Sequence, residues 1–392
     1  MTGATTAIPD GMPQAEVLNR LNRLKTLARE RGLAGLVAVA RSFYDRPANV
    51  AYLSNHFPPF PTGMFWGEAR GLGHAALIIP LDGEPVLFFD TTVRRDLVPI
   101  KDCRHARNFS RSISDALREK QLGAGRVGLL GDDLMPVAMY REITQALPGL
   151  TLEPADDLLT SLRLIKSERE QQLMRRACAI CDIGYTATFN AIRDGATEAA
   201  VCGAGIGAAM TAGADFIRYL RTHSGPYSAW GIRWPQAMDR VMRNGEMLAL
   251  DLIGAYWGQQ FDVLRSTVVG RKATEAQKKQ METALAATRA AVAAARPGVL
   301  AEDLVKAANQ VIESQGFGKF ARPFIGHGIG YETMEPPLLA MGDRTPLRPG
   351  MVICVEPGIN IPDVGGACIE EQIIITDGAP EVISRFEPRQ WE

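Results

Sequence analysis

The sequence lacks the features that mark several protein classes. No apolar run approaches the ~20 residues that a membrane-spanning helix needs, and the N-terminal stretch MTGATTAIPDGMPQAEVLNRL has no basic start followed by an apolar segment. A formal net charge of -1 gives no overall basic character of the kind that attracts nucleic acid or anionic membranes. We therefore expect a cytoplasmic protein that binds neither nucleic acid nor membrane.

Cysteine is also sparse, with six residues scattered through 392. This usage argues for reduced thiols in a cytoplasm rather than for a disulfide framework. Cys178 and Cys181 form a lone CxxC inside a helical pattern, and a zinc site would need a second such pair. We interpret the two thiols as packing residues of a helix.

The length predicts two domains, because single hydrophobic cores stop growing at about 250–300 residues. Residues 1–160 alternate helical and strand patterns, which predicts a mixed α/β domain. Residues 161–392 show a different pattern, with long helices, strand pairs and further helices. The predicted fold class is therefore α+β. The main elements expected are helices at 14–32, 168–214, 274–296 and 301–316, and strands at 33–40, 74–90 and 246–270.

Two aspartates flank a glycine-containing turn in MLALDLIGAYWGQQFDVLRSTVVG (247–270). If the turn centres between Tyr256 and Trp257, Asp251 and Asp262 lie directly opposite each other and share one face of the hairpin. Two carboxylates so placed repel each other, and a cation between them reverses the sign of that effect. The pattern therefore predicts a metal-binding hairpin.

A second hairpin carries a second acidic pair. In MVICVEPGINIPDVGGACIEEQIIIT (351–376), a turn centred on Asp363 predicts that Glu356 faces Glu370. His327 lies between two glycines, where backbone can approach closely and the imidazole is unhindered. Each feature alone has an ordinary structural explanation, but four carboxylates and one imidazole together suit two divalent ions such as Mn²⁺, Co²⁺, Fe²⁺ or Zn²⁺. We expect the carboxylates to line one face of one curved sheet.

At these residues the chain resembles the pita-bread metallopeptidase family, which includes aminopeptidase P, prolidase and methionine aminopeptidase. LDLIGAYWGQQFDVLRST, PFIGHGIG, PGMVICVEPGI and GGACIEEQ are similar to its metal-binding segments in order and spacing, and LRLIKSEREQQLMRRA is similar to the helix that begins its catalytic domain. The resemblance is close in 158–392 and loose in 1–157. It implies a creatinase-like N-terminal domain, a C-terminal pita-bread domain and a homodimer.

The resemblance also implies a role for each ligand. Asp251 would bind one ion and His327 the other, while Asp262 and Glu370 would bridge the two. Glu356 would be both a ligand and the proton acceptor for the water that attacks an amide carbonyl.

Three positions depart from the proline-directed members of that family. Those members carry two further histidines, where this chain has Trp234 and Met334, and an arginine, where it has Cys368. Tryptophan offers one N–H donor and methionine none, and neither titrates near neutrality. The proton that a leaving nitrogen needs would then come from Glu356, from a water molecule or from a substitute such as His223.

Aromatic residues gather in segments 56–66 and 227–234. They could enclose a compact apolar or cationic group, or equally they could pack a domain or dimer interface. For Trp234 we favour the pocket, because its position is anchored on Asp251. The candidate substrate-binding residues are Trp234, Met334, Tyr227, Trp230, Phe65 and Trp66.

Three functions compete. The main hypothesis is a dinuclear metal-dependent hydrolase resembling Xaa-Pro aminopeptidase and prolidase, acting on short peptides. The alternative is a pita-bread hydrolase or lyase acting on a small metabolite, such as a cationic compatible solute, which the lost histidines and the aromatic segments favour. A binding module with a vestigial site is disfavoured, because all five ligands are retained.

Overall fold

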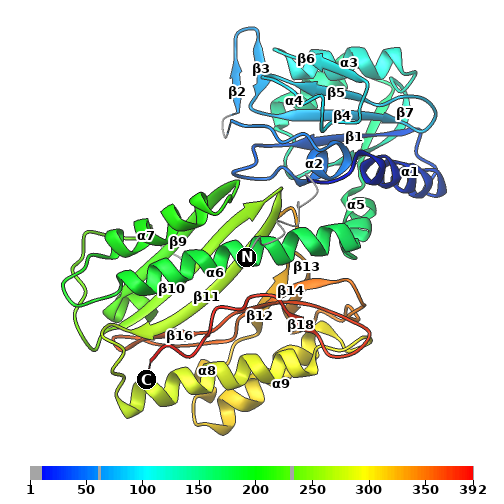
Figure 1. Ribbon diagram of the computed structural model, residues 1–392. Coiled ribbons are helices and arrows are strands. Elements are labelled where there is room, and N and C mark those ends of the chain that lie inside the picture. The colour runs from blue at the N-terminus through cyan, green and yellow to red at the C-terminus, as the bar shows by residue number, and fades with distance from the viewer. Residues whose placement is uncertain (1–10, 61–62, 230–233, 392) are drawn as a thin grey trace, which may run out of the picture. The chain divides into compact units, whose positions relative to one another are not determined.

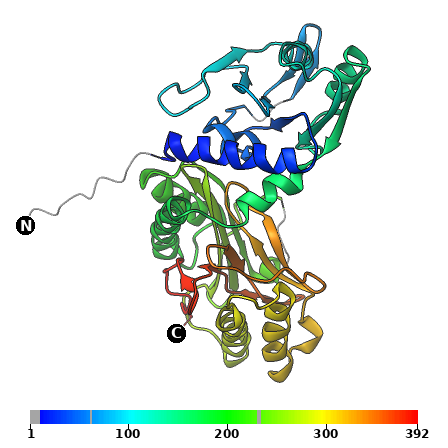
Figure 2. The ribbon, with the colours of Figure 1, turned by 90° about the vertical axis from the view of Figure 1, so that its right-hand side faces the viewer.

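The computed structural model describes residues 11–60, 63–229 and 234–391 (Figures 1 and 2). The chain forms two compact units, Met1–Arg163 and Leu164–Glu392. Among the helices of the described ranges, none is long and apolar enough to cross a membrane. The fold class is α+β, as the sequence predicts, and each unit has its own sheets and helices.

The N-terminal unit is built on a six-stranded sheet of order β6-β5-β4-β1-β7-β8. Strand β1 pairs antiparallel with β4 and parallel with β7, so the sheet is mixed. The segment 74–90 forms two strands, as expected, with Asp82 and Gly83 in the connection. The strands are β1 (Gly35–Ala40), β4 (Ala75–Pro80), β5 (Val86–Phe89), β6 (Asp102–His105), β7 (Gly125–Leu130) and β8 (Leu150–Pro154).

Within residues 11–60 and 63–163, five helices and one short hairpin complete this unit. Strands β1 and β4 are buried along their whole length, and apolar side chains of α3 and α4 pack in the same core cluster as theirs. The remaining elements are α1 (Gln14–Glu30), α2 (Ala48–Ser54), α3 (Phe109–Glu119), α4 (Val137–Ala146), α5 (Asp156–Arg163), β2 (Met64–Trp66) and β3 (Ala69–Leu72).

The described part of the C-terminal unit contains two helix pairs and three sheets. In Figure 1, α6 and α7 (green) lie along the sheet β11-β10-β9, and α8 and α9 (yellow) lie along the strands of the chain's last quarter. Those strands form the sheet β13-β12-β14-β17-β18 and the ladder β15-β16. The helices are α6 (Glu168–Ala191), α7 (Glu198–Thr211), α8 (Glu275–Ala294) and α9 (Ala301–Ser314), with 3₁₀ turns at Gly225–Ala229 and Gly318–Phe320.

The strands of this unit are β9 (Phe216–Ser224), β10 (Met247–Tyr256), β11 (Gln259–Val268), β12 (Phe324–Gly328), β13 (Glu335–Ala340), β14 (Val352–Val355), β15 (Gly358–Ile361), β16 (Gly365–Cys368), β17 (Glu371–Ile374) and β18 (Glu381–Val382).

Helix α6 begins at a complete capping box, in which Ser167 and Glu170 each accept a hydrogen bond from the other's backbone N–H. Its buried side includes Cys178 and Cys181, which lie in the main apolar core of the unit. The interpretation of this CxxC as helix packing is therefore confirmed.

The first acidic hairpin has a different register from the predicted one. Tyr256 pairs with Gln259, so Trp257 and Gly258 form the turn, and Trp257 has a left-handed φ of 49°. Asp251 consequently faces Leu264 rather than Asp262. The prediction of direct opposition is wrong by two residues. Because side chains alternate with a period of two, the diagonal pair still shares one face.

The second acidic hairpin has the predicted register. Gly358 pairs with Cys368 in one ladder and Val355 with Glu371 in the next, so Glu356 and Glu370 occupy matching positions between the two ladders. The two hairpins do not share one continuous sheet, which corrects the expectation of a single curved sheet. They are joined where Glu370 N–H donates to the Leu264 carbonyl at 3.0 Å.

Tyr185 of α6 ties the two strands of the first hairpin together from behind. Its hydroxyl lies 2.6 Å from the Val263 carbonyl and 3.2 Å from the Leu250 carbonyl, next to both aspartates in sequence. Replacing Tyr185 by Phe should lower the free energy of unfolding by about 1 kcal/mol, because one buried hydrogen bond is lost. Thermal unfolding checks this, with Tyr140→Phe on the exposed side of α4 as the control. Equal melting temperatures for both variants would contradict the role.

Candidate metal centre

Five side chains of metal-ligand type come together from five separate strand positions. Asp251 lies on β10, Asp262 on β11 and His327 on β12, while Glu356 directly follows β14 and Glu370 directly precedes β17. Donor atoms of Asp262, His327 and Glu370 all lie within 4.8 Å of one another. Four of the five sequence-predicted ligands, all except Glu370, line one pocket, and Glu370 joins them through its contacts with Asp262 and His327.

The orientation of the His327 ring follows from its backbone contact. Nδ1 lies 2.9 Å from the Gly328 carbonyl, which can only accept, so Nδ1 carries the proton. Nε2 is then left with a lone pair, and it lies 3.7 Å from Asp262 Oδ2 and 3.8 Å from Glu356 Oε1. Burial lowers the pKa of His327, which favours the neutral ring that a metal requires.

The carboxylates are buried together at a high electrostatic cost. Asp251, Asp262 and Glu370 are each at most 5% exposed. Burial raises the pKa of Asp262 and Glu370 well above the ordinary values, and the charges of neighbouring carboxylates raise both further. For Glu356, burial and then the Asp251 charge raise the pKa to about 7. The cluster is therefore unstable as four free carboxylates.

The donor set fits divalent ions. Asp251 Oδ1 and Glu370 Oε1 are buried without a hydrogen-bond partner among the described residues. Such oxygens are costly unless something binds them. Ligand atoms around one ion with bonds of about 2.1 Å lie about 3–4 Å apart, and the His327 contacts have this spacing. Carboxylate oxygens and one imidazole nitrogen suit Mn²⁺, Co²⁺, Fe²⁺ or Zn²⁺.

The glycines beside His327 have a steric function. Gly326 has a φ of 146°, and a Cβ there would lie 2.0 Å from the Cys354 carbonyl oxygen on β14. A Cβ on Gly328 would lie 2.3 Å from the Pro336 carbonyl oxygen on β13. Strand β12 therefore fits between its two neighbours only without side chains at these positions, which fixes the place of the imidazole.

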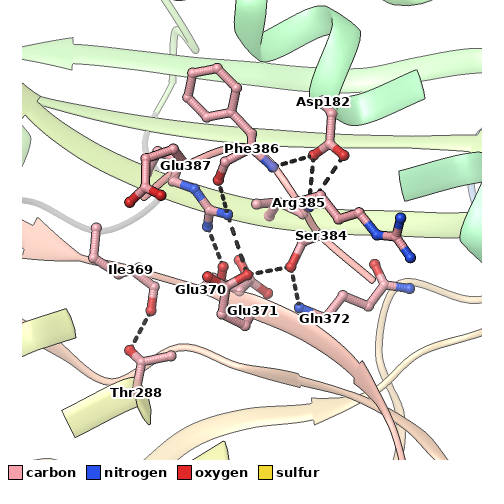
Figure 3. Close-up of polar contacts among 12 residues, drawn as sticks. Asp182, Thr288, Ile369, Glu370, Glu371, Gln372, Ser384, Arg385, Phe386 and Glu387 are labelled. Carbon is pink, nitrogen blue, oxygen red and sulfur yellow. Dashed lines mark hydrogen bonds and ion pairs between the residues drawn. The ribbon is translucent and has the colours of Figure 1, made fainter. Parts of the chain in front are cut away.

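Gln372 connects the two acidic hairpins through its side chain. Its Oε1 accepts a hydrogen bond from the Asp262 N–H at 3.2 Å, and its Nε2 donates to the Gln260 carbonyl at 3.3 Å. The Gln372 N–H in turn donates to Ser384 Oγ at 3.1 Å (Figure 3). The position of Asp262 is therefore coupled to the strand that follows Glu370.

Glu371 faces away from the ligand cluster. Its carboxylate accepts a hydrogen bond from Ser384 Oγ (Figure 3). It also forms an ion pair with the buried Arg265 at 3.3 Å. Thr288 Oγ1 donates to the Ile369 carbonyl at 2.7 Å, just before Glu370. These contacts hold the backbone on both sides of Glu370 and leave its own side chain for the pocket.

The pocket over the ligands has a cavity volume of about 290 Å³. Met334 lines it, so this predicted substrate-side residue lies in the wall. Among the described residues, the wall also includes Tyr219, Arg221 and Arg322, which the sequence analysis did not single out. The only sequence signal for Tyr219 and Arg221 is the strand-like run FIRYLRTHS, which carries a charged residue among apolar ones, and Arg322 has no such signal.

The other proposed substrate residues are placed differently. Trp234 is 89% exposed and is not part of this wall, and Tyr227 is exposed outside it. Phe65 and Trp66 belong to β2 of the N-terminal unit. Trp230 lies outside the described residues.

His223 does not line the pocket either. It is fully buried on β9, and its Nε2 lies 3.2 Å from the Pro235 carbonyl. Its direct strand partner is Ala249, two residues before Asp251. His223, which the sequence analysis named as a substitute proton donor, is therefore buried outside the pocket wall with its ring against the Pro235 carbonyl.

The sequence matches the models of two protein families. The metallopeptidase family M24 matches residues 172–377, and the creatinase/prolidase N-terminal domain matches residues 20–165. The chain therefore belongs to metallopeptidase family M24 and is a metal-dependent hydrolase. Its N-terminal unit is a creatinase-type domain, and its C-terminal unit is the pita-bread catalytic domain, as the resemblance implies.

Named relatives and solved structures both align with most of the length of this chain. The Xaa-Pro dipeptidase of Pyrococcus horikoshii is 28% identical over 303 residues, which are 77% of this chain and 83% of that protein. The probable dipeptidase PepE of Mycobacterium tuberculosis is 31% identical over 318 residues, covering 78% and 82%. The crystal structure of the prolidase from P. horikoshii superposes with a TM-score of 0.81 at 25% identity and covers 95% of this chain and 99% of that one.

Gly326→Ala tests the steric argument for the His segment. The added methyl overlaps the Cys354 carbonyl and the φ angle is unfavourable, so we expect a loss of about 2 kcal/mol or more in stability and weaker metal retention. Gly203→Ala, where nothing lies within 4 Å of the new methyl in helix α7, is the control and should be neutral or stabilising. Thermal unfolding and metal analysis measure both variants. A Gly326→Ala protein with the melting temperature and metal content of the wild type would refute the account.

Proposed function

We propose that this protein hydrolyses the Xaa-Pro bond of short peptides at two divalent metal ions held by Asp251, Asp262, His327, Glu356 and Glu370. The observation that carries the proposal is that four of these side chains line one pocket and Glu370 lies in a cluster with two of them, with two buried carboxylate oxygens left without a hydrogen-bond partner among the described residues. The Xaa-Pro dipeptidase and prolidase names of the relatives supply the substrate class.

The assignment of the ligands to the two ions is the one that the family resemblance implies. Asp262 and Glu370 share their cluster with His327 and would bridge the two ions, while Asp251 would complete the second coordination sphere. The ions would polarise the scissile carbonyl and acidify the attacking water. Manganese is our first choice of metal, because the set is rich in oxygen donors.

Glu356 is the side chain best placed to move a proton. It is the most accessible of the four carboxylates, with 24% of its side chain exposed, and it lies beside His327 in the pocket wall. It would accept a proton from the attacking water and return it to the leaving nitrogen. His223 is not available for this step because it lies outside the wall.

The pocket wall favours a peptide over the alternative of a cationic metabolite. The guanidiniums of Arg221 and Arg322 line it, and positive charge disfavours a cationic ligand. Met334 offers an apolar surface where proline-directed relatives were expected to have a histidine. We propose that this surface packs against the proline ring.

The cytoplasmic location and the homodimer remain predictions from the sequence. Size-exclusion chromatography with light scattering checks the dimer.

Asp262→Asn should lose metal and activity together, because the bridging position needs a charged ligand. We expect Mn²⁺ content to fall by at least half and hydrolysis of Ala-Pro to fall by at least about 100-fold. Asp377→Asn, an exposed aspartate outside the pocket, should match the wild type. Metal analysis and dipeptide assays measure both variants, and full activity of Asp262→Asn would rule out the bridging role.

A further inference from the structure

Arg221 is a buried cation in the wall of the metal pocket. Only 6% of the residue is exposed, and its side chain forms no hydrogen bond or ion pair with any residue in the described ranges. A guanidinium stays protonated at any physiological pH and carries five N–H donors. Its charge acts on the neighbouring Asp251, but its buried N–H donors have no acceptor among the described residues, which is costly and leaves room for an acceptor from a ligand.

The strand register directs Arg221 to the same side as the metal ligands. On β9, Arg221 is the direct antiparallel partner of Asp251 on β10. Directly opposed residues share one face of a sheet. Arg221 therefore lies beside the acidic cluster, yet within the described ranges it forms no ion pair with any of the four carboxylates, which leaves its donors for a ligand.

Arg322 brings a second guanidinium to the same pocket from another element. It precedes β12, and its backbone is fixed to α9 by Asn309, which donates to the Arg322 carbonyl at 2.8 Å and accepts from its N–H at 3.3 Å. Its side chain is without a hydrogen bond or ion pair among the described residues. It is exposed, so it stands at the rim where Arg221 stands at the base.

Both guanidinium-bearing residues share the wall of this pocket with Glu356 and Cys368. Two divalent ions would balance the four carboxylates, so the arginines leave the loaded pocket with an excess of positive charge. An anionic ligand group next to Glu356 and Cys368 would balance it.

We propose that Arg221 and Arg322 form a carboxylate-binding subsite that anchors the free C-terminal carboxylate of the substrate. Arginine binds carboxylates through paired N–H donors, which gives both affinity and orientation. The substrates selected are dipeptides, in which the residue after the scissile bond carries the terminal carboxylate, rather than longer or amidated peptides. The cleaved bond rests on the proposed function, but the carboxylate subsite itself can be tested without cleavage.

The test uses the full-length protein loaded with Mn²⁺ and two pairs of probes. Calorimetric titration compares L-proline with L-prolinamide, and N-acetyl-L-alanine with its amide. Within each pair, one compound carries a free carboxylate and the other an amide in its place. The second pair contains no proline, so it reports on the subsite even if Xaa-Pro peptides are not the substrate. We expect each acid to bind about tenfold or more tightly than its amide.

Variants assign that preference to the two arginines. Arg221→Gln should reduce the acid-over-amide ratio to within about twofold, and Arg322→Gln should reduce it partly, while amide binding stays unchanged. Arg221→Lys should recover part of the ratio, because it keeps the charge but loses the planar fork. Arg218→Gln, on the same strand but outside the pocket wall, is the control.

The same variants give a kinetic readout. With Ala-Pro and Ala-Pro amide as substrates, loss of the anchor should raise KM for the dipeptide and leave kcat/KM for the amide unchanged. An equal fall for both substrates would show a general effect on the metal centre and overturn the proposal. Unchanged acid-over-amide ratios in Arg322→Gln and in either Arg221 variant would also overturn the proposal. Arg322 is exposed, so Arg322→Gln is expected to fold normally.

Discussion

The burial of four carboxylates in one pocket is the constraint on which the rest of the catalytic unit depends. Asp251, Asp262 and Glu370 lose their hydration and face each other's charge, which would drive protons onto them in the absence of a cation. The surrounding structure nevertheless fixes them in place. Gln372, for example, couples the backbone of Asp262 to the strand after Glu370. Such rigidity is useful only if ions restore the charge balance.

The sequence alone was sufficient to find the ligand-type residues and the class of the protein. Acidic residues on either side of turns, together with a glycine-flanked histidine, are local patterns that survive errors in register. The first hairpin illustrates this: its turn lies at Trp257 and Gly258, one residue beyond the predicted centre, and Asp251 and Asp262 still share a face. Side chains alternate between the two faces of a strand, so a shift of two residues in the strand pairing leaves both aspartates on the same face.

The substrate side of the pocket was much less predictable, because it depends on contacts between segments that are distant in the sequence. Trp234 was chosen because the resemblance matches it to a family histidine, and His223 was chosen as a substitute proton donor, but the pairing of β9 and the exposure of Trp234 decide where they lie. Arg221 was missed for the opposite reason. A charged residue within a strand is usually solvated, and only the pairing with β10 shows that it is buried beside Asp251.

The central claim is that the five side chains hold two ions. The most direct measurement is a titration of Mn²⁺ into the full-length apoprotein, with bound metal counted by elemental analysis after removal of free ions. The account predicts saturation near two ions per chain and a higher melting temperature of the loaded protein, because binding to the folded state stabilises it. A protein that binds no Mn²⁺, Co²⁺, Fe²⁺ or Zn²⁺ would contradict it.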